Sequence, residues 1–201
     1  MTKIKIAVAG CMGRMGQEIT KQILKNKNLL FVGGFEHKNH PKINRSLKEA
    51  ANINSLINVS NNSTEVIKAA DVLIDFTTPT STLSNIKVAA SKKTAVVIGT
   101  TGMNEKQIKK VKSFSNKIPI LLSSNMSLGV NLLFNLVKKT ASVLRDEEYD
   151  IEIAETHHKH KKDAPSGTAL SLGEYAAVGR KVKLNKIKVL DRTKKTSKRT
   201  K

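Results

Sequence analysis

Short apolar segments alternate with amphipathic segments through the first 122 residues of this 201-residue chain. Apolar runs of strand length occupy residues 4–9, 29–35, 72–76, 95–98 and 118–122. Between them, apolar side chains recur at helical spacing over residues 15–26, 64–70, 80–92 and 104–115. Fully apolar strands that alternate with helices are typical of a parallel sheet covered on both faces. We therefore predict a doubly wound α/β domain, with Ser63 as a helix N-cap.

The pattern changes between residues 124 and 130. A longer amphipathic helix is predicted over 130–144, and polar and apolar residues alternate over 149–154, as in a half-exposed strand of a mixed sheet. Another helix is predicted over 168–177 and a last strand over 187–190. We predict that residues 1–127 form the first domain, that 128–190 belong to a second, and that 191–201 are a disordered basic tail.

A glycine-rich loop joins the first predicted strand to the first helix. Its sequence is Gly10-Cys11-Met12-Gly13-Arg14-Met15-Gly16, with the glycines spaced GxxGxxG. Glycines permit a tight turn, let backbone N–H groups approach a pyrophosphate and open a helix whose N-terminus favours an anion. The alternative is an ordinary strand-to-helix turn. We predict that this loop, from Gly10 to Met15, binds a dinucleotide.

Glu36 ends the second predicted strand, where an acid would accept hydrogen bonds from the ribose of an adenine dinucleotide. A carboxylate at this position favours NADH. Arg14 in the glycine loop and His37 and Lys38 after the strand are expected close by and could pair with the 2′-phosphate of NADPH. The residues therefore predict a nicotinamide cofactor and leave the choice between NADH and NADPH open.

Polar segments follow three of the later strands. They begin at Thr77, at Gly99 and at Ser123. In open parallel sheets ligands bind at the carboxyl ends of the strands, so these segments predict one cleft for the nicotinamide. The predicted cofactor-binding residues of this cleft are Gly99, Thr100, Thr101, Ser123, Ser124, Asn125 and Met126.

Three histidines and three lysines crowd residues 157–162, ahead of a Pro165-Ser166-Gly167-Thr168 turn. A zinc site would need further ligands such as cysteines, and we predict no metal here. A solvated basic loop would have no need of that turn. Acid–base chemistry fits better, because a lysine beside other cations gives up its proton more readily. Ser166, Gly167 and Thr168, at a helix N-terminus, would bind a carboxylate.

Charge and composition limit the other function classes. The net charge is +20, but residues 180–201 contribute half of it with 11 Lys or Arg and one acid, and aromatic residues are 3% of the chain with no Trp. Bases would find no stacking platform, so we expect no specific nucleic-acid partner. No apolar run reaches the ~18 residues of a membrane span, and the N-terminus lacks a signal-peptide layout. One cysteine, Cys11, excludes an internal disulfide, and we expect a cytoplasmic protein.

Several of these motifs, in this order, resemble the 4-hydroxy-tetrahydrodipicolinate reductases of lysine and diaminopimelate biosynthesis. The similar residues span about 3–177 and include the GxxGRMG loop, Asp75-Phe76-Thr77, Val97 to Gly102, Asn125 with Gly129-Val130-Asn131, and Glu155-x-His157-His158-x-x-Lys161-x-Asp163-Ala164-Pro165-Ser166-Gly167-Thr168-Ala169. The last of these motifs is highly specific to the family. A general amino-acid dehydrogenase would not explain its His157-His158-x-x-Lys161 spacing.

The resemblance implies a reaction and assigns roles. A hydride would pass from NADH or NADPH to a cyclic imine dicarboxylate, with loss of water. His157 and Lys161 would be the catalytic pair, with Lys161 the proton donor, and His158, Gly167 and Thr168 would bind the substrate carboxylates. The family also forms homotetramers through its second domain.

The family's second domain continues through several more strands than this sequence offers. After Leu190 no apolar residue remains to pair or pack. We therefore expect a truncated product with an incomplete α+β substrate and oligomerisation domain, in which the homotetramer is doubtful. The alternative function is a catalytically silent remnant that still binds the dinucleotide.

Overall fold

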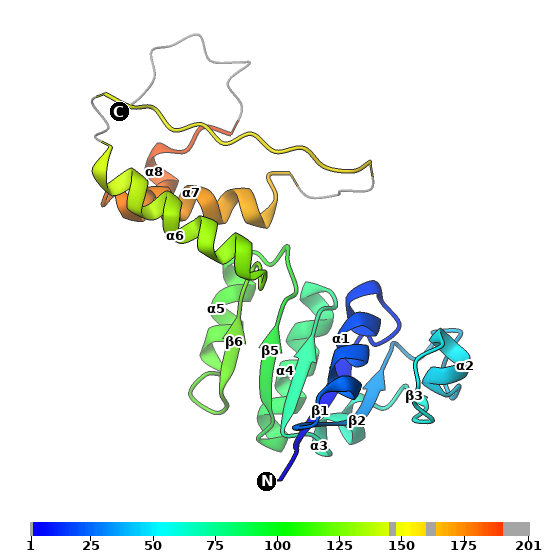
Figure 1. Cartoon of the computed structure of the whole chain (residues 1–201). Coiled ribbons are helices and arrows are strands. Elements are labelled where there is room, and N and C mark those ends of the chain that lie inside the picture. Colours follow the sequence, from blue (N-terminus) through cyan, green and yellow to red (C-terminus); the bar gives the residue numbers. More distant parts are fainter. Residues whose placement is uncertain (1, 145–147, 160–163, 191–201) are drawn as a thin grey trace. The chain divides into compact units, whose positions relative to one another are not determined.

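The computed structural model describes residues 2–144, 148–159 and 164–190 (Figure 1). The chain divides into two compact units. The first ends at Ser123 and the second begins at Ser124, within the stretch where the sequence pattern changes.

The first unit is built on a six-stranded parallel sheet with the strand order β3-β2-β1-β4-β5-β6. The strands are β1 (Ile4–Ala9), β2 (Leu29–Phe35), β3 (Val59–Ser60), β4 (Val72–Asp75), β5 (Ala95–Ile98) and β6 (Ile120–Leu122). The predicted doubly wound sheet is confirmed. Strand β3 was not predicted, because two residues are too short to show a pattern. The strand order reverses between β1 and β4, which is where such sheets bind ligands.

Five helices connect these strands: α1 (Arg14–Lys25), α2 (Leu47–Ala51), α3 (Ser63–Lys68), α4 (Pro79–Lys92) and α5 (Glu105–Ser113). The predicted cap of α3 is wrong by one residue: Asn62 is the N-cap, its side-chain oxygen accepts from the Glu65 amide at 3.2 Å, and Ser63 is the first helical residue. Both residue types cap well, and only the backbone geometry decides between them. Helix α2 was missed, although Ser46 and Glu49 form a capping box at its start.

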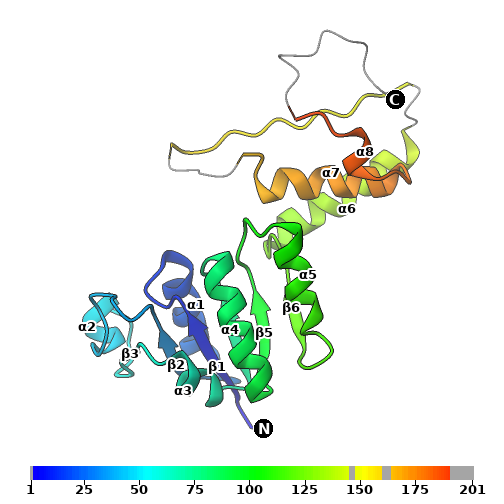
Figure 2. The ribbon, with the colours of Figure 1, turned by 180° about the vertical axis from the view of Figure 1, so that it is seen from behind.

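The core of this unit lies on both faces of the sheet, which Figures 1 and 2 show from opposite sides. In β1, Ile6 and Val8 pack in one cluster with Ile23 of α1. Ala7 and Ala9 pack in another, with Ile67 of α3 and Ile86 of α4. Successive side chains of a strand point to opposite faces, so a strand buried on both must be apolar throughout. This is why β1 reads as an uninterrupted apolar run.

The α1 side of the sheet is covered less completely. The strand register places Val8, Ile74, Val97 and Leu121 on this one face. Val8 is buried, but Leu121 in β6 is 56% exposed. Within the described residues, cover is therefore densest over β1 and β2, where α1 packs.

The second unit contains α6 (Leu128–Val143), α7 (Gly167–Gly179) and α8 (Leu184–Ile187). Helices α6 and α7 lie side by side (Figures 1 and 2). The Phe134 ring stacks on Tyr175 with centroids 5.1 Å apart. At Gly179 a Cβ atom would lie 2.4 Å from the Lys138 carbonyl oxygen, so the helices approach each other through a residue without a side chain.

Both strands predicted for this unit are wrong. Residues 149–154 run as an extended segment outside any sheet, with Tyr149, Ile151 and Ile153 between 42% and 48% exposed, and residues 184–187 form α8. A strand is stabilised by hydrogen bonds to a neighbouring strand, and the described part of this unit offers none. Residues 191–201, predicted to be a disordered tail, lie outside the described residues.

Candidate functional site

The glycine loop forms a closed turn at the carboxyl end of β1. Gly10 has φ +66°, in the left-handed region that favours glycine. Its N–H donates to the Phe35 carbonyl at 2.9 Å, which ties the loop to β2, and the Gly13 N–H donates to the Gly10 carbonyl at 3.0 Å. The backbone itself therefore holds the turn.

Gly16 lets the first turn of α1 sit directly on this loop. A Cβ atom at this position would lie 2.1 Å from the Gly10 carbonyl oxygen and 2.8 Å from the Cys11 Cα atom. Both neighbours are backbone atoms. The helix start and the loop are thus packed backbone against backbone.

Helix α1 begins without a side-chain cap, because its N-cap residue is Gly13, and its first turn has no acidic residue. By contrast, Ser46, Asn62, Thr78, Asn104, Ser127 and Ser166 cap helices α2 to α7 with their side chains. The first-turn N–H groups of a helix have no partner inside the helix and carry partial positive charge. The start of α1 therefore fits a phosphate group, as the glycine spacing predicts.

Glu36 meets the glycine loop from the end of β2. Its carboxylate accepts a hydrogen bond from the Met12 N–H at 2.8 Å. The Cys11 side chain is fully buried in the core beneath. This burial, and secondarily the Glu36 charge, raises the pKa of the Cys11 thiol to about 12. Cys11 can therefore offer a ligand only its backbone, whereas Arg14 and Met15 are exposed on the first turn.

The ends of β4 and β5 meet around the carboxylate of Asp75. This side chain is fully buried. It accepts hydrogen bonds from the Thr77 hydroxyl at 2.6 Å, the Thr82 hydroxyl at 3.1 Å and the Asn85 amide at 2.8 Å. The Thr100 hydroxyl lies 3.3 Å from the same carboxylate and also accepts from the Thr77 N–H at 3.1 Å. The structure thus joins two of the polar strand ends that the sequence predicts to form a cleft.

The remaining predicted residues of the first unit lie at the same edge of the sheet. Gly99 packs on Phe76, whose ring carbon would lie 2.1 Å from a Cβ atom there. Thr100 is buried within the Asp75 cluster, and Thr101 is exposed. The Ser123 N–H donates to the Ile98 carbonyl at 3.1 Å, which holds the end of β6 beside β5.

In the second unit, Glu155 connects the histidine segment to the start of α7. Its carboxylate accepts hydrogen bonds from the Ser166 N–H at 2.8 Å and from the Ser166 hydroxyl, and it pairs with Nε2 of His157 at 2.8 Å. These contacts, the Ser166 hydroxyl first and His157 next, lower the pKa of Glu155 to about 2. A charged Glu155 therefore orients the imidazole that the sequence predicts to be catalytic.

Other predicted residues of this unit gather at the N-terminus of α7. The Asn125 side-chain amide donates to the Thr168 hydroxyl at 3.3 Å, and the Ser124 and Ser171 hydroxyls are 2.8 Å apart. Gly167 is the first residue of the helix. Met126 is 40% exposed, and His158 follows His157 in the exposed segment. Lys161, the predicted proton donor, lies outside the described residues.

No role was predicted from the sequence for Asp75, Thr82, Asn85 or Glu155. One signal was available for Asp75: an acid that ends an otherwise apolar strand must be paired if it is buried. Nothing in the sequence brings Thr82 and Asn85 to it.

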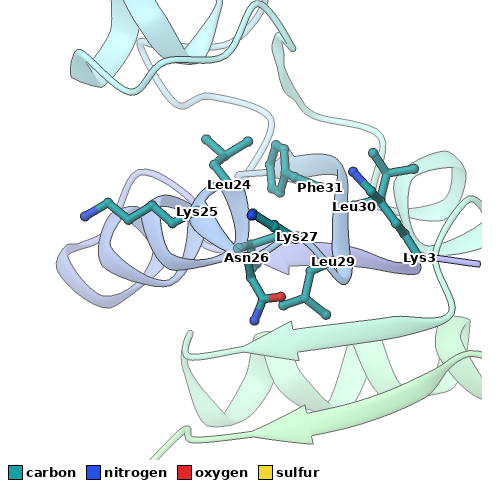
Figure 3. Close-up of a pocket in the computed structure, with 9 residues that line it drawn as sticks. Lys3, Leu24, Lys25, Asn26, Lys27, Leu29, Leu30 and Phe31 are labelled. Carbon is teal, nitrogen blue, oxygen red and sulfur yellow. The ribbon is translucent and has the colours of Figure 1, made fainter. Parts of the chain in front are cut away.

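A hollow of about 300 Å³ lies in the first unit, between the end of α1 and the start of β2. Figure 3 shows the side chains that line it. Its lining includes Lys3, Lys25 and Lys27. It lies at the amino ends of β1 and β2 and contains none of the predicted site residues. Elsewhere in the described ranges, no three metal-binding side chains come together and no helix has the length and apolarity to cross a membrane.

Comparison with known proteins agrees with this arrangement. The family model described as "Dihydrodipicolinate reductase, N-terminus" matches residues 4–126, and the model of the corresponding C-terminus matches residues 129–200. The 4-hydroxy-tetrahydrodipicolinate reductase of Pelagibacter ubique is 46% identical over 180 residues, which cover 90% of this chain and 66% of that protein. The enzyme of the same name from Buchnera aphidicola is 41% identical over 189 residues, which cover 90% of this chain and 67% of that protein.

Among solved structures, a dipicolinate-bound dihydrodipicolinate reductase from Paenisporosarcina sp. TG-14 is similar, with a TM-score of 0.68 and 29% identity. The match covers 89% of this chain and 67% of that one. The chain therefore spans about two thirds of the length of the relatives it matches.

Proposed function

The chain belongs to the dihydrodipicolinate reductase family, and we propose that it binds NADH or NADPH and reduces 4-hydroxy-tetrahydrodipicolinate to tetrahydrodipicolinate. The observation that carries this proposal is the uncapped N-terminus of α1 packed on the glycine loop. It lies beside the point where the strand order of the sheet reverses. Both features are those of a dinucleotide site.

In this proposal the first unit holds the cofactor. Gly10 to Met15 bind the pyrophosphate, Glu36 accepts from a ribose hydroxyl, and the ends of β5 and β6 receive the nicotinamide. The bound nicotinamide supplies the hydride. Arg14 is exposed two residues after Met12, whose N–H donates to Glu36, and Lys38 is exposed two residues after Glu36. The 2′-phosphate of NADPH would therefore also find cations, and we propose that both cofactors bind.

The second unit holds the substrate and supplies the proton. The reaction consumes one hydride and one proton and releases one water. The first-turn amides of Gly167 and Thr168 would bind a substrate carboxylate with His158. His157, oriented by Glu155, and Lys161 would form the catalytic pair, with Lys161 as the proton donor.

We also propose that the protein works in the cytoplasm and that any homotetramer forms through the second unit. Leu128, Leu132 and Leu136 follow one another at intervals of four on α6 and are between 53% and 87% exposed. An exposed apolar stripe of this kind is typical of a surface that contacts another protein chain. Light scattering of the purified chain measures the oligomeric state directly.

The test of the main proposal is a titration followed by a turnover assay on the full chain. NADH and NADPH are titrated first, then dipicolinate, the ligand bound in the similar solved structure. Oxidation of the cofactor is then followed with freshly generated substrate. Turnover supports the proposal, cofactor binding without turnover supports the silent remnant, and failure to bind either cofactor refutes both.

Two substitutions separate the proposed roles. Lys161→Ala is expected to lower kcat by ~10²–10⁴ if the ammonium group is the general acid. Thr168→Ala, at the start of α7, is expected to raise KM more than it lowers kcat. An unchanged kcat in Lys161→Ala with a raised KM would reduce that lysine to a binding role.

A further inference from the structure

Asp75 is the most completely buried charged side chain in the first unit, and it lies at the edge of the sheet where the glycine loop begins. We propose that Asp75 is a positioning residue. It locks the ends of β4 and β5 and the glycine loop into the geometry that binds the nicotinamide cofactor. This inference rests on the proposed function, because it concerns the same cofactor site.

Several hydrogen-bond donors meet at the Asp75 carboxylate. One oxygen receives the Thr77 N–H at 3.0 Å and the Thr77 hydroxyl at 2.6 Å, with the Thr82 hydroxyl at 3.1 Å. The other oxygen receives the Asn85 amide at 2.8 Å. A carboxylate only accepts hydrogen bonds, so each of these donors is held in one orientation. A network in which every member is paired is rigid.

Thr77 connects the Asp75 carboxylate to the glycine loop. Thr77 turns its hydroxyl to Asp75, and its methyl group lies so close to Gly10 that a Cβ atom there would be 2.8 Å away. Gly10 is the residue with positive φ that opens the loop. The rotamer of Thr77, set by Asp75, therefore limits where the loop can lie.

Thr100 connects the Asp75 carboxylate to the end of β5. The Thr100 hydroxyl contacts both the Thr82 hydroxyl, at 2.8 Å, and the Thr77 N–H, at 3.1 Å. It is buried between Gly99 and Thr101, two of the residues predicted to contact the cofactor. Asp75 itself is fully buried and thus acts through these neighbours rather than on the ligand.

The test substitution is Asp75→Asn. It keeps the shape of the side chain but replaces one acceptor oxygen by an NH₂ donor, in a site where hydrogen-bond donors already surround the carboxylate. NADH is titrated against the wild type and the variant, at a temperature where circular dichroism shows both folded. We expect the Kd for NADH to rise about tenfold, the effect of losing roughly one well-paired buried interaction.

The matched control is Thr94→Val. The Thr94 hydroxyl is also buried in this sheet and donates to the Ile67 carbonyl at 3.0 Å, but at the amino end of β5, away from the glycine loop. Loss of the Thr94 hydroxyl should lower the free energy of unfolding of the first unit and leave the Kd for NADH within about twofold of wild type. A purely structural Asp75 would behave in the same way, so an unchanged Kd in Asp75→Asn overturns the inference.

A double-mutant cycle tests the route through Thr77. In a Thr77→Val background the hydroxyl that Asp75 orients is gone, so Asp75→Asn should raise the Kd by less than it does alone. Should Asp75→Asn fail to fold, Thr82→Val removes one donor from the same carboxylate and is expected to raise the Kd about threefold. If the wild type binds neither cofactor, the proposed function itself fails. If the wild type binds and neither Asp75→Asn nor Thr82→Val changes the Kd, only this inference fails.

Discussion

Replacing Gly16 by alanine adds one methyl group at the tightest contact of the glycine loop. The new Cβ atom would lie 2.1 Å from the Gly10 carbonyl oxygen, 0.9 Å short of the 3.0 Å below which real Cβ contacts essentially never fall. The loop cannot yield cheaply, because hydrogen bonds at 2.9 Å and 3.0 Å tie Gly10 to Phe35 and to Gly13. Overpacking of this kind costs ~1–3 kcal/mol, and alanine recovers up to about 1 kcal/mol of helix propensity. A 2.1 Å contact with backbone belongs at the upper end of that range, so after the helix gain we expect a net loss of about 2 kcal/mol in the first unit, or roughly a 30-fold rise in its opening equilibrium.

Cys11 provides the assay, because it is the only cysteine and is fully buried in the first unit. A thiol reagent reaches it only when this unit opens, so the labelling rate at neutral pH should rise about 30-fold in Gly16→Ala. The Kd for NADH should rise as well. A labelling rate within twofold of wild type would show that the loop accommodates the methyl group and would refute the packing argument.

Gly129→Ala is the matched control, since Gly129 also lies in the first turn of a helix. Its Cβ atom would meet nothing closer than the Ser127 hydroxyl oxygen at 3.9 Å. The same substitution there should leave Cys11 labelling unchanged. A rise equal to that of Gly16→Ala would trace the effect to alanine itself rather than to the contact.

Two further predictions concern pH, and each unit carries its own reporter. Burial raises the pKa of the Cys11 thiol from 9.0 to about 12, so the unfolded chain ionises first and stability falls as pH rises above 9. Urea unfolding at pH 8 and pH 10 should show a loss of about 1 kcal/mol that is missing from Cys11→Ala, and equal losses in both proteins would contradict it. The pKa of Glu155 is lowered from 4.5 to about 2, so its stabilising contribution is present above pH 4.5 and is lost as pH falls toward 2. Both tyrosines of the chain lie in the second unit. Their fluorescence in acid should therefore show a weaker pH dependence for Glu155→Gln, and an identical acid transition would mean that the Ser166 and His157 contacts do not stabilise the unit.

Prediction from the sequence succeeded where a strong apolar or glycine pattern lies within a few residues, and it missed the weaker local signals of α2, β3 and the α3 cap. The apolar strands and the glycine loop each lie within a few residues, and β1, β2 and β5 have the predicted bounds. The prediction of a strand at residues 149–154 failed, because the alternating pattern shows only that this segment could pair with another strand. Whether a strand forms there depends on a partner elsewhere in the chain, and the described residues supply none.

The candidate site likewise has parts that the sequence predicts and parts that only the tertiary structure shows. The sequence by itself predicted the glycine loop and the helix that follows it, because the spacing of the glycines and the apolar periodicity behind them are local features, and both are typical of an anion site. It also placed the histidine segment beside the Ser166 turn, which the Glu155 contacts bring together. Only the tertiary structure decided that Asp75 gathers hydroxyls from Thr77, Thr82 and Thr100. Those residues come from two strand ends and a helix, and a buried carboxylate selects its partners through packing in space, which spacing along the chain does not encode.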